Sequence, residues 1–240
     1  MPLSFRNTIL SSLSDAEAAA LTRGGSRQEL RFGEPIQQAG DHVEWVYFPE
    51  GGLLSLINTT KNGQMAETGM VGIDGACNLV EACGAGLATM SSVVQVSGPA
   101  WRVPAAACRD LSRRSPDFAD KIWRQLEFQL IEARQAALCR SFHNVESRLA
   151  RWLLELRERD SAMATLNMTQ EFLAGMLGVQ RSTVSAFAGT LQDRGLIRYT
   201  RGVVTFLDLD GLEALACECR TVLEEHRKRL SPPPPQRAER

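Results

Sequence analysis

A cluster of short polar and basic side chains lies in the second half of the sequence, where two helices are predicted to meet. The members of this donor cluster are Gln180, Arg181, Ser182, Thr183 and Ser185. Such side chains can hydrogen-bond to base edges in the major groove of duplex DNA, where an arginine can bond to both acceptors of a guanine. The donor cluster is therefore a candidate DNA contact surface.

The residues around the donor cluster predict the helix pair that must position it. Apolar residues within 173–177 fall on one helical face, and Gly178 ends that helix. Apolar residues within 184–191 give the next helix an inner face of its own, opposite the donor cluster. Two short helices joined by a tight turn predict a helix-turn-helix, whose second helix enters the groove.

A two-stranded hairpin is predicted directly after this helix pair. Gly195 is a C-cap glycine for the second helix, and residues 196–207 alternate around a turn at Arg201-Gly202. This order predicts a winged helix-turn-helix. The remaining candidate DNA contacts are Thr169, which also suits a helix N-cap, with Gln170, Arg198 and Arg201.

The first half of the chain has a different pattern. Residues 27–103 contain short apolar runs separated by glycine-rich turns, including Asn62-Gly63, which favours a hairpin. Close-spaced strands of this kind predict a small β-sandwich or barrel. Before these strands, a short helical region is predicted within residues 1–20, where Ser14-Asp15 caps a helix.

A long amphipathic helix is predicted between the two halves, over residues 118–139. Its apolar positions recur every three or four residues without glycine or proline, which favours pairing with a second copy of the chain. The alternative is that this stripe packs against its own β-domain. The predicted dimerisation residues are Phe118, Ile122, Leu126, Leu130, Ala133 and Ala137.

We thus expect an α+β fold with four regions. Residues 1–117 form a sensor β-domain, 118–143 a dimerisation helix and hinge, 144–230 the winged helix-turn-helix, and 231–240 a disordered proline-rich tail. Within the third region, helices are predicted at 145–158 and, after the wing, as one continuous helix at 208–230.

Charge is distributed unevenly along a chain whose formal net charge is −1. Residues 144–207 carry 8 arginines and 6 acidic residues, a balance of +2, whereas the segments on either side are net negative.

The 240-residue chain has 44% hydrophobic residues and no apolar run of membrane-spanning length, and we expect no signal peptide from its first residues. We expect a cytoplasmic protein without membrane contact.

Six scattered cysteines in such a chain make structural disulfides unexpected. Cys217 and Cys219 lie two apart in a predicted helix and so face apart, with only His226 nearby, so we assign no metal site and no cofactor. Cys77 and Cys83 leave redox sensing open as an alternative to apolar filling. No catalytic motif is present, and we expect no enzyme activity.

The order of these parts resembles the Crp/Fnr family of bacterial transcription regulators, over about residues 7–230. The turn into the recognition helix, Gly-Val-Gln-Arg-Ser-Thr-Val at 178–184, is similar to that of the family, as is Arg-Gly-Leu-Ile at 194–197. The runs VYFPEGGLLSL and ETGMVGIDGACNL are similar to its sensor β-roll, a cupin-like domain. The resemblance implies a homodimer on a near-palindromic operator, contact with RNA polymerase, and a small-molecule or redox signal that the sequence does not identify.

Departures from the family pattern indicate which branches of the family this sequence resembles least. Cyclic-nucleotide binders of the family carry an arginine for the cyclic phosphate, but none occurs between Arg31 and Arg102, and Lys61 lies in a predicted hairpin turn. An unpaired buried phosphate is costly, so we expect no cyclic AMP binding. No cysteine precedes Cys77, which disfavours the iron–sulfur branch.

The recognition helix also departs from the family pattern. Ser182 replaces an acidic residue and Ala186 a second arginine, so the operator should differ from the familiar ones. Two alternatives stay open: a cyclic-nucleotide-dependent regulator, and a sensor or adaptor whose winged helix binds protein.

Overall fold

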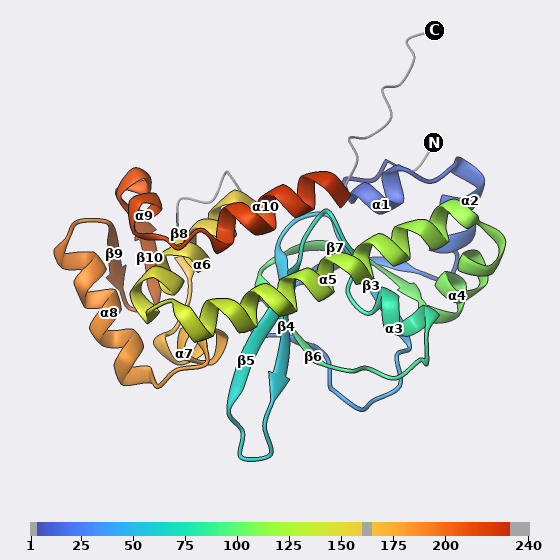
Figure 1. Cartoon of the computed structure of the whole chain (residues 1–240). Coiled ribbons are helices and arrows are strands. Elements are labelled where there is room, and N and C mark those ends of the chain that lie inside the picture. The colour runs from blue at the N-terminus through green and yellow to red at the C-terminus, as the bar shows by residue number, and fades with distance from the viewer. Residues whose placement is uncertain (1–3, 160–164, 231–240) are drawn as a thin grey trace, which may run out of the picture.

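The computed structural model describes residues 4–159 and 165–230. Two short helices, α1 (Thr8–Ser11) and α2 (Asp15–Thr22), begin the described chain. Ser14 caps α2 through a capping box with Glu17, as its position before an alanine-rich run predicts. Figure 1 shows these helices at one end of the molecule and the helix-turn-helix at the other, with a long helix crossing in front.

Two antiparallel sheets form the body of the N-terminal half. One has the strand order β1-β7-β3 and the other β2-β6-β4-β5. The strands are β1 (Ser26–Leu30), β2 (Pro35–Gln37), β3 (Trp45–Pro49), β4 (Leu53–Thr59), β5 (Met65–Val71), β6 (Ser91–Val96) and β7 (Gly98–Pro104). The predicted β-domain is confirmed, and Gly63, at φ +83°, lies in the turn between β4 and β5.

Two helices in this half were not predicted. The helix α3 (Leu79–Cys83) interrupts the strands, and α4 (Ala105–Arg114) follows β7 directly. Cys108 and Leu111 of α4 are buried against the same core as α2 and α3. The helix α3 has 5 residues and α4 has 10, so both are shorter than the window of about 11–18 residues over which helical periodicity is read.

The long helix α5 (Pro116–Phe142) begins at Ser115, whose side chain accepts a hydrogen bond from the Phe118 amide. Proline at its first position suits a helix N-terminus. Phe118 and Ile122 are buried in the core of the β-domain, so their assignment to the dimer interface needs correction. The stripe is not continuous on one face: its first residues pack inward, while those from Leu126 onward are largely exposed.

The C-terminal half contains a three-stranded sheet, in the order β8-β10-β9, surrounded by helices. Its elements are α6 (Val145–Arg159), β8 (Thr165–Asn167), α7 (Gln170–Leu177), α8 (Arg181–Asp193), β9 (Ile197–Thr200), β10 (Val203–Phe206), α9 (Leu209–Leu215) and α10 (Cys219–Leu230). The helix expected at 208–230 is thus two helices, because Ala216 adopts extended backbone angles, φ −64° and ψ 146°. The predicted tail at 231–240 lies outside the described residues.

The two halves share a hydrophobic core. Leu53 and Ile57 of β4 belong to the same buried cluster as Leu153 of α6. The rings of Phe32 and Phe172 lie 5.2 Å apart between centroids, and α7 packs beside β5 (Figure 1). Among residues 4–159 and 165–230, no helix is both long and apolar enough to cross a bilayer.

Candidate nucleic-acid interface

The turn between α7 and α8 is built as its sequence predicts. Gly178 caps α7 with φ +65°, and the amide of Val179 donates to the Ala174 carbonyl over 3.0 Å. Gln180 is extended, and α8 starts at Arg181. Because Val184 and Leu191 are buried, the first turn of α8 has to present its other face to solvent.

Every member of the donor cluster retains some exposure. Gln180, Arg181 and Ser182 are exposed, while Thr183 and Ser185 are half-buried. The hydroxyl of Ser185 donates to Oε1 of Gln170 over 2.6 Å and is also within bonding distance of the Arg181 carbonyl, at 3.1 Å. This contact joins the N-terminal part of α8 to the first residue of α7.

Thr169 is the N-cap of α7. Its hydroxyl accepts a hydrogen bond from the Phe172 amide over 3.1 Å, as predicted. The side-chain oxygen of the neighbouring Gln170 accepts from Ser185, so the amide nitrogen is the donor that this side chain can offer to a ligand.

The wing is a tight hairpin between β9 and β10. Arg201 and Gly202 both have positive φ, +52° and +77°, which is the geometry of a type I′ turn. The hydroxyl of Tyr199 donates to the Met168 carbonyl over 2.7 Å, and the Met168 amide donates to the Gly202 carbonyl over 2.6 Å. These bonds fix the wing against the segment that leads into α7.

A surface hollow of about 540 Å³ lies between the wing and the start of α8. Its lining residues are Thr169, Gln170, Glu171, Arg181, Tyr199, Arg201 and Gly202. Tertiary structure thus brings together four of the predicted contacts from three separate elements, while Arg198 is exposed on β9 outside the lining. Two arginines beside a helix N-terminus favour an anionic ligand such as a phosphate.

Sequence reasoning did not find Tyr199 or Glu171 in this hollow. Burial raises the pKa of Tyr199, and the neighbouring Arg181 acts in the opposite direction. The aromatic residue within an otherwise alternating wing was the one available signal, since a tyrosine on a strand has an apolar body and a polar tip.

A second cavity, of about 350 Å³, lies between α5, α10 and β5. Its lining includes Asp74, Phe128, Glu132 and Arg227. Arg159 lies 3.5 Å from Asp74 and 3.3 Å from Glu132, so this polar network links the β-domain, the long helix and α6. Burial raises the pKa of Glu132 to about 8, although the charge of Arg159 opposes the shift.

The cysteines of the β-domain are poor candidates for redox chemistry. Burial raises the pKa of Cys77 to about 12 and that of Cys83 above its ordinary value, which suppresses the reactive thiolate. Apolar filling therefore describes these two residues better than redox sensing does.

Cys217 and Cys219 are not placed as the sequence predicts. Cys217 lies in the link between α9 and α10 instead of inside a helix, and Cys219 begins α10. Both lie beside Cys139 and His143, and His226 is not part of the group. Spacing along the sequence did not predict this group, because the two pairs of residues are more than seventy positions apart.

Comparisons with known proteins agree with this geometry. A family model described as a Crp-like helix-turn-helix domain matches residues 147–215. The chain is 24% identical over 208 residues to the fumarate and nitrate reduction regulatory protein of Salmonella typhi, covering 82% of this chain and 80% of that protein. The homologue from Escherichia coli K12 is 23% identical over the same length and coverage.

Solved structures share the fold. A Crp/Fnr family regulator from Eubacterium rectale superposes with a TM-score of 0.68 at 20% identity, covering 85% of this chain and 94% of that one. FixK2 from Bradyrhizobium japonicum gives a TM-score of 0.67 at 17% identity, covering 80% and 98%.

A β-domain joined by a long helix to a winged helix-turn-helix defines a class of transcription regulator. Within that class, residues 147–215 match a Crp-like helix-turn-helix domain, and the chain as a whole is similar to regulators of the Crp/Fnr family.

Proposed function

We propose that this regulator binds a specific, near-palindromic operator as a homodimer and acts there on RNA polymerase. The observation that carries the proposal is the exposure of Arg181 at the start of α8, beside Arg201 of the wing and the N-terminal end of α7. A helix that buries one face and presents donors at its first turn fits the major groove, with the wing against the adjacent backbone.

The contacts divide into two kinds. Arg181 reads a guanine through its O6 and N7 acceptors, with Gln180, Ser182, Thr183 and Ser185 as shorter-range contacts. Thr169, Gln170, Arg198 and Arg201 bind phosphates and set the register of the protein on the duplex. Ser185 and Gln170 also support each other through their 2.6 Å hydrogen bond, which restrains the side-chain amide of Gln170.

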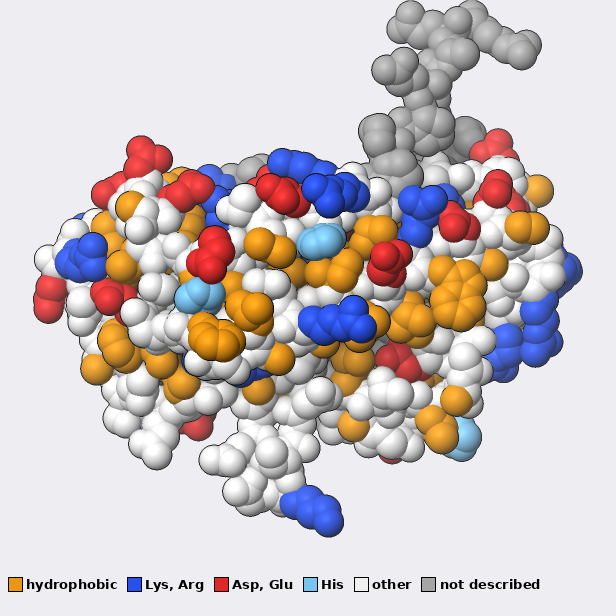
Figure 2. Space-filling view, viewed as in Figure 1, with side chains coloured by type: hydrophobic (Ala, Val, Ile, Leu, Met, Phe, Trp, Pro, Cys, Tyr) orange, Lys and Arg blue, Asp and Glu red, His pale blue; other side chains and the backbone are white. Residues whose placement is uncertain are grey.

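Dimerisation is assigned to the exposed face of α5. Trp123, Leu126, Leu130, Ala133 and Ala137 recur at spacings of three and four, and Trp123 and Leu130 are 67% and 46% exposed. Figure 2 shows hydrophobic side chains gathered along the band where α5 crosses the molecule. A coiled-coil pairing of two copies would cover this stripe. The two α8 helices would then enter grooves about 34 Å apart.

The course of α5 supports the four-part organisation proposed from the sequence. Its first turns are buried in the β-domain, its middle is exposed, and its last turn meets the C-terminal half. We place signal reception at the 350 Å³ cavity between α5, α10 and β5, because a ligand there would contact all three parts. The signal itself is a small molecule of unassigned chemistry, and calorimetry with cyclic AMP and cyclic GMP is expected to show no tight binding.

The direct test is selection of bound fragments from a genomic DNA library, followed by affinity measurements on the selected site. Arg181→Ala should weaken specific binding by about 1–3 kcal/mol and relax the base preference at one position of each half-site. Arg113→Ala, an exposed arginine on α4 of the other half, is the matched control and should leave affinity unchanged. No selected site, or an unchanged preference in the Arg181 variant, would overturn the proposal.

A further inference from the structure

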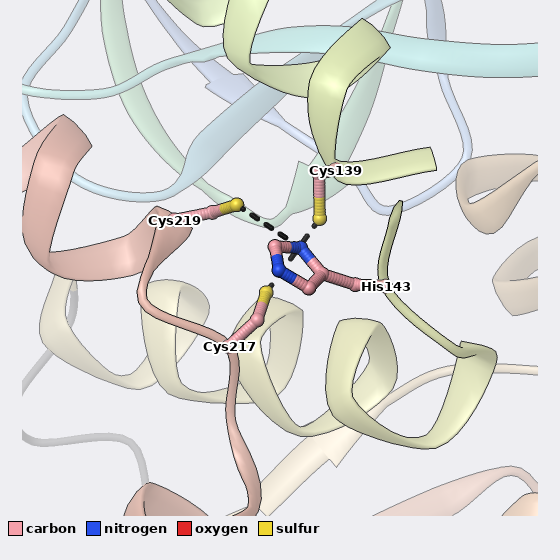
Figure 3. Close-up of side chains that lie close together, drawn as sticks. All are labelled: Cys139, His143, Cys217 and Cys219. Carbon is pink, nitrogen blue, oxygen red and sulfur yellow. Dashed lines mark hydrogen bonds between the residues drawn. The ribbon is translucent and has the colours of Figure 1, made fainter. Parts of the chain in front are cut away.

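Four potential metal ligands converge where the long helix meets the last helix. Cys139 lies in the last turn of α5 and His143 caps that helix, while Cys217 precedes α10 and Cys219 begins it. Their four ligand atoms all lie within 4.8 Å of one another. Figure 3 shows the three thiols and the imidazole pointing toward a common centre. We call these four residues the Cys/His cluster.

We propose that the Cys/His cluster is a structural Zn²⁺ site. The Sγ atoms of Cys139 and Cys217 lie 3.6 Å apart, and Sγ of Cys219 lies 3.4 Å from Nδ1 of His143. A tetrahedral ion with Zn–S bonds of about 2.3 Å and a Zn–N bond of about 2.0 Å separates sulfurs by about 3.8 Å and sulfur from nitrogen by about 3.5 Å. Two of the six ligand separations therefore already match the edges of a zinc tetrahedron, and the others, all within 4.8 Å, need at most a small closure around the ion.

The imidazole of His143 is held in the orientation that a zinc ligand needs. Its Nδ1 faces the thiols, and its Nε2 lies 3.3 Å from Oε1 of Glu218. A carboxylate that accepts from the far nitrogen fixes the tautomer and makes the near nitrogen a better ligand, an arrangement typical of zinc-bound histidine. Glu218 thus gives a second observation, independent of the ligand distances.

The surroundings suit the charge of such a site. Three thiolates around one Zn²⁺ carry a net charge of −1, and the three cysteines are buried. The guanidinium of Arg151 on α6 interacts electrostatically with Cys139 and Cys217, and it is also ion-paired with the buried Glu155 over 2.5 Å. A nearby cation of this kind reduces the cost of placing a negative site in the interior.

Two other chemistries fit less well. A disulfide between Cys139 and Cys217 needs the sulfurs about 2.0 Å apart, whereas they lie 3.6 Å apart, and it would leave Cys219 and His143 without a role in the cluster. An iron–sulfur cluster places several metal and sulfide atoms between its ligands, and the 4.8 Å spread leaves room for one ion only.

The local backbone explains why these residues can converge. Cys139 and His143 are four apart, so they lie on one side of the end of α5. The extended backbone of Ala216 ends α9 before α10 begins. Cys217 and Cys219 are therefore not two apart within one helix, and both side chains can face the same centre. A bound ion would hold the end of α5 against the start of α10. This position is next to the hinge between α5 and α6.

Zinc binding at the Cys/His cluster is independent of DNA binding and can be measured without DNA. The full chain is purified without chelator, and its zinc content is measured by mass spectrometry and its ligand set by X-ray absorption at the zinc edge. We expect about one zinc per chain, bound by three sulfurs and one nitrogen. Replacement by Co²⁺ should give the visible absorption of a tetrahedral thiolate site.

Three variants make the test specific. Cys217→Ser should lose most of the zinc, whereas Cys83→Ser, a cysteine of the β-domain, should retain it. Because a ligand variant can unfold, Glu218→Gln provides a milder change: its side chain is 71% exposed, so folding should be unaffected while zinc affinity falls about 10- to 100-fold. A protein that binds no added Zn²⁺, that contains a Cys139–Cys217 disulfide or an iron–sulfur cluster, or that keeps its zinc in the Cys217 variant would overturn the proposal.

Discussion

The indole nitrogen of Trp152 donates a hydrogen bond to Oε1 of Glu67 over 2.8 Å, and this bond joins α6 of the DNA-binding half to β5 of the β-domain. Both side chains are buried. Arg140 of α5 donates to the main-chain carbonyl of the same glutamate, so three parts of the chain meet there. A conformational change at β5 can therefore be transmitted to the DNA-binding half through α6 as well as through the long helix α5.

The first prediction concerns the pH dependence of this contact. Burial raises the pKa of Glu67 from 4.5 to about 7, so the folded protein holds a proton that the unfolded chain releases. The stabilisation from that proton is complete below about pH 4.5 and is lost as the pH rises through about 7. Glu132, whose pKa is raised to about 8, acts in the same direction.

Glu67→Gln isolates the contribution of this one group. The amide keeps an acceptor for Trp152 and cannot ionise, so the variant should gain stability over the native chain on going from about pH 5 to pH 8. The full shift corresponds to roughly 3 kcal/mol at most. Urea unfolding at both pH values measures it, and an equal difference between the two proteins at both pH values would contradict the prediction.

The second prediction concerns the exposed face of α5. Leu130→Glu places a charge in the proposed dimer stripe and should weaken self-association at least about tenfold, or 1.4 kcal/mol. Leu87→Glu is a matched control, because Leu87 is 43% exposed but lies in the β-domain, against 46% for Leu130. Sedimentation equilibrium measures the association, and a dimer unaffected by Leu130→Glu would move the interface elsewhere.

The third prediction concerns the wing. Arg201 has a positive φ, so Arg201→Asn removes the charge while keeping a residue that tolerates this conformation. If each protomer loses one phosphate contact, affinity should fall for all DNA sequences alike, and the slope of log K against log salt should decrease by about 1 for each protomer. Anisotropy titrations at several salt concentrations measure the slope. An altered base preference with an unchanged slope would assign Arg201 to base reading instead.

Local patterns accounted for much of the fold and for the candidate DNA surface. The glycine at 178, the apolar residues of α8 and the Arg201-Gly202 turn each act within a few residues, so spacing and turn chemistry sufficed to predict the helix pair and the wing. The hollow that joins Thr169, Arg181 and Arg201 was less visible, because its walls come from three elements.

Long-range packing decides which apolar positions of a helix are buried, and periodicity along the sequence does not predict this. Phe118 and Leu130 belong to one apolar pattern, yet the first is inside the β-domain core and the second is exposed, because only neighbouring elements determine which turns of a helix are covered.

The same reason applies to Glu67 with Trp152, and to Cys139 and His143 with Cys217 and Cys219. These groups are separated by tens of residues, and a chain reveals such partners only when folding brings its distant segments into contact.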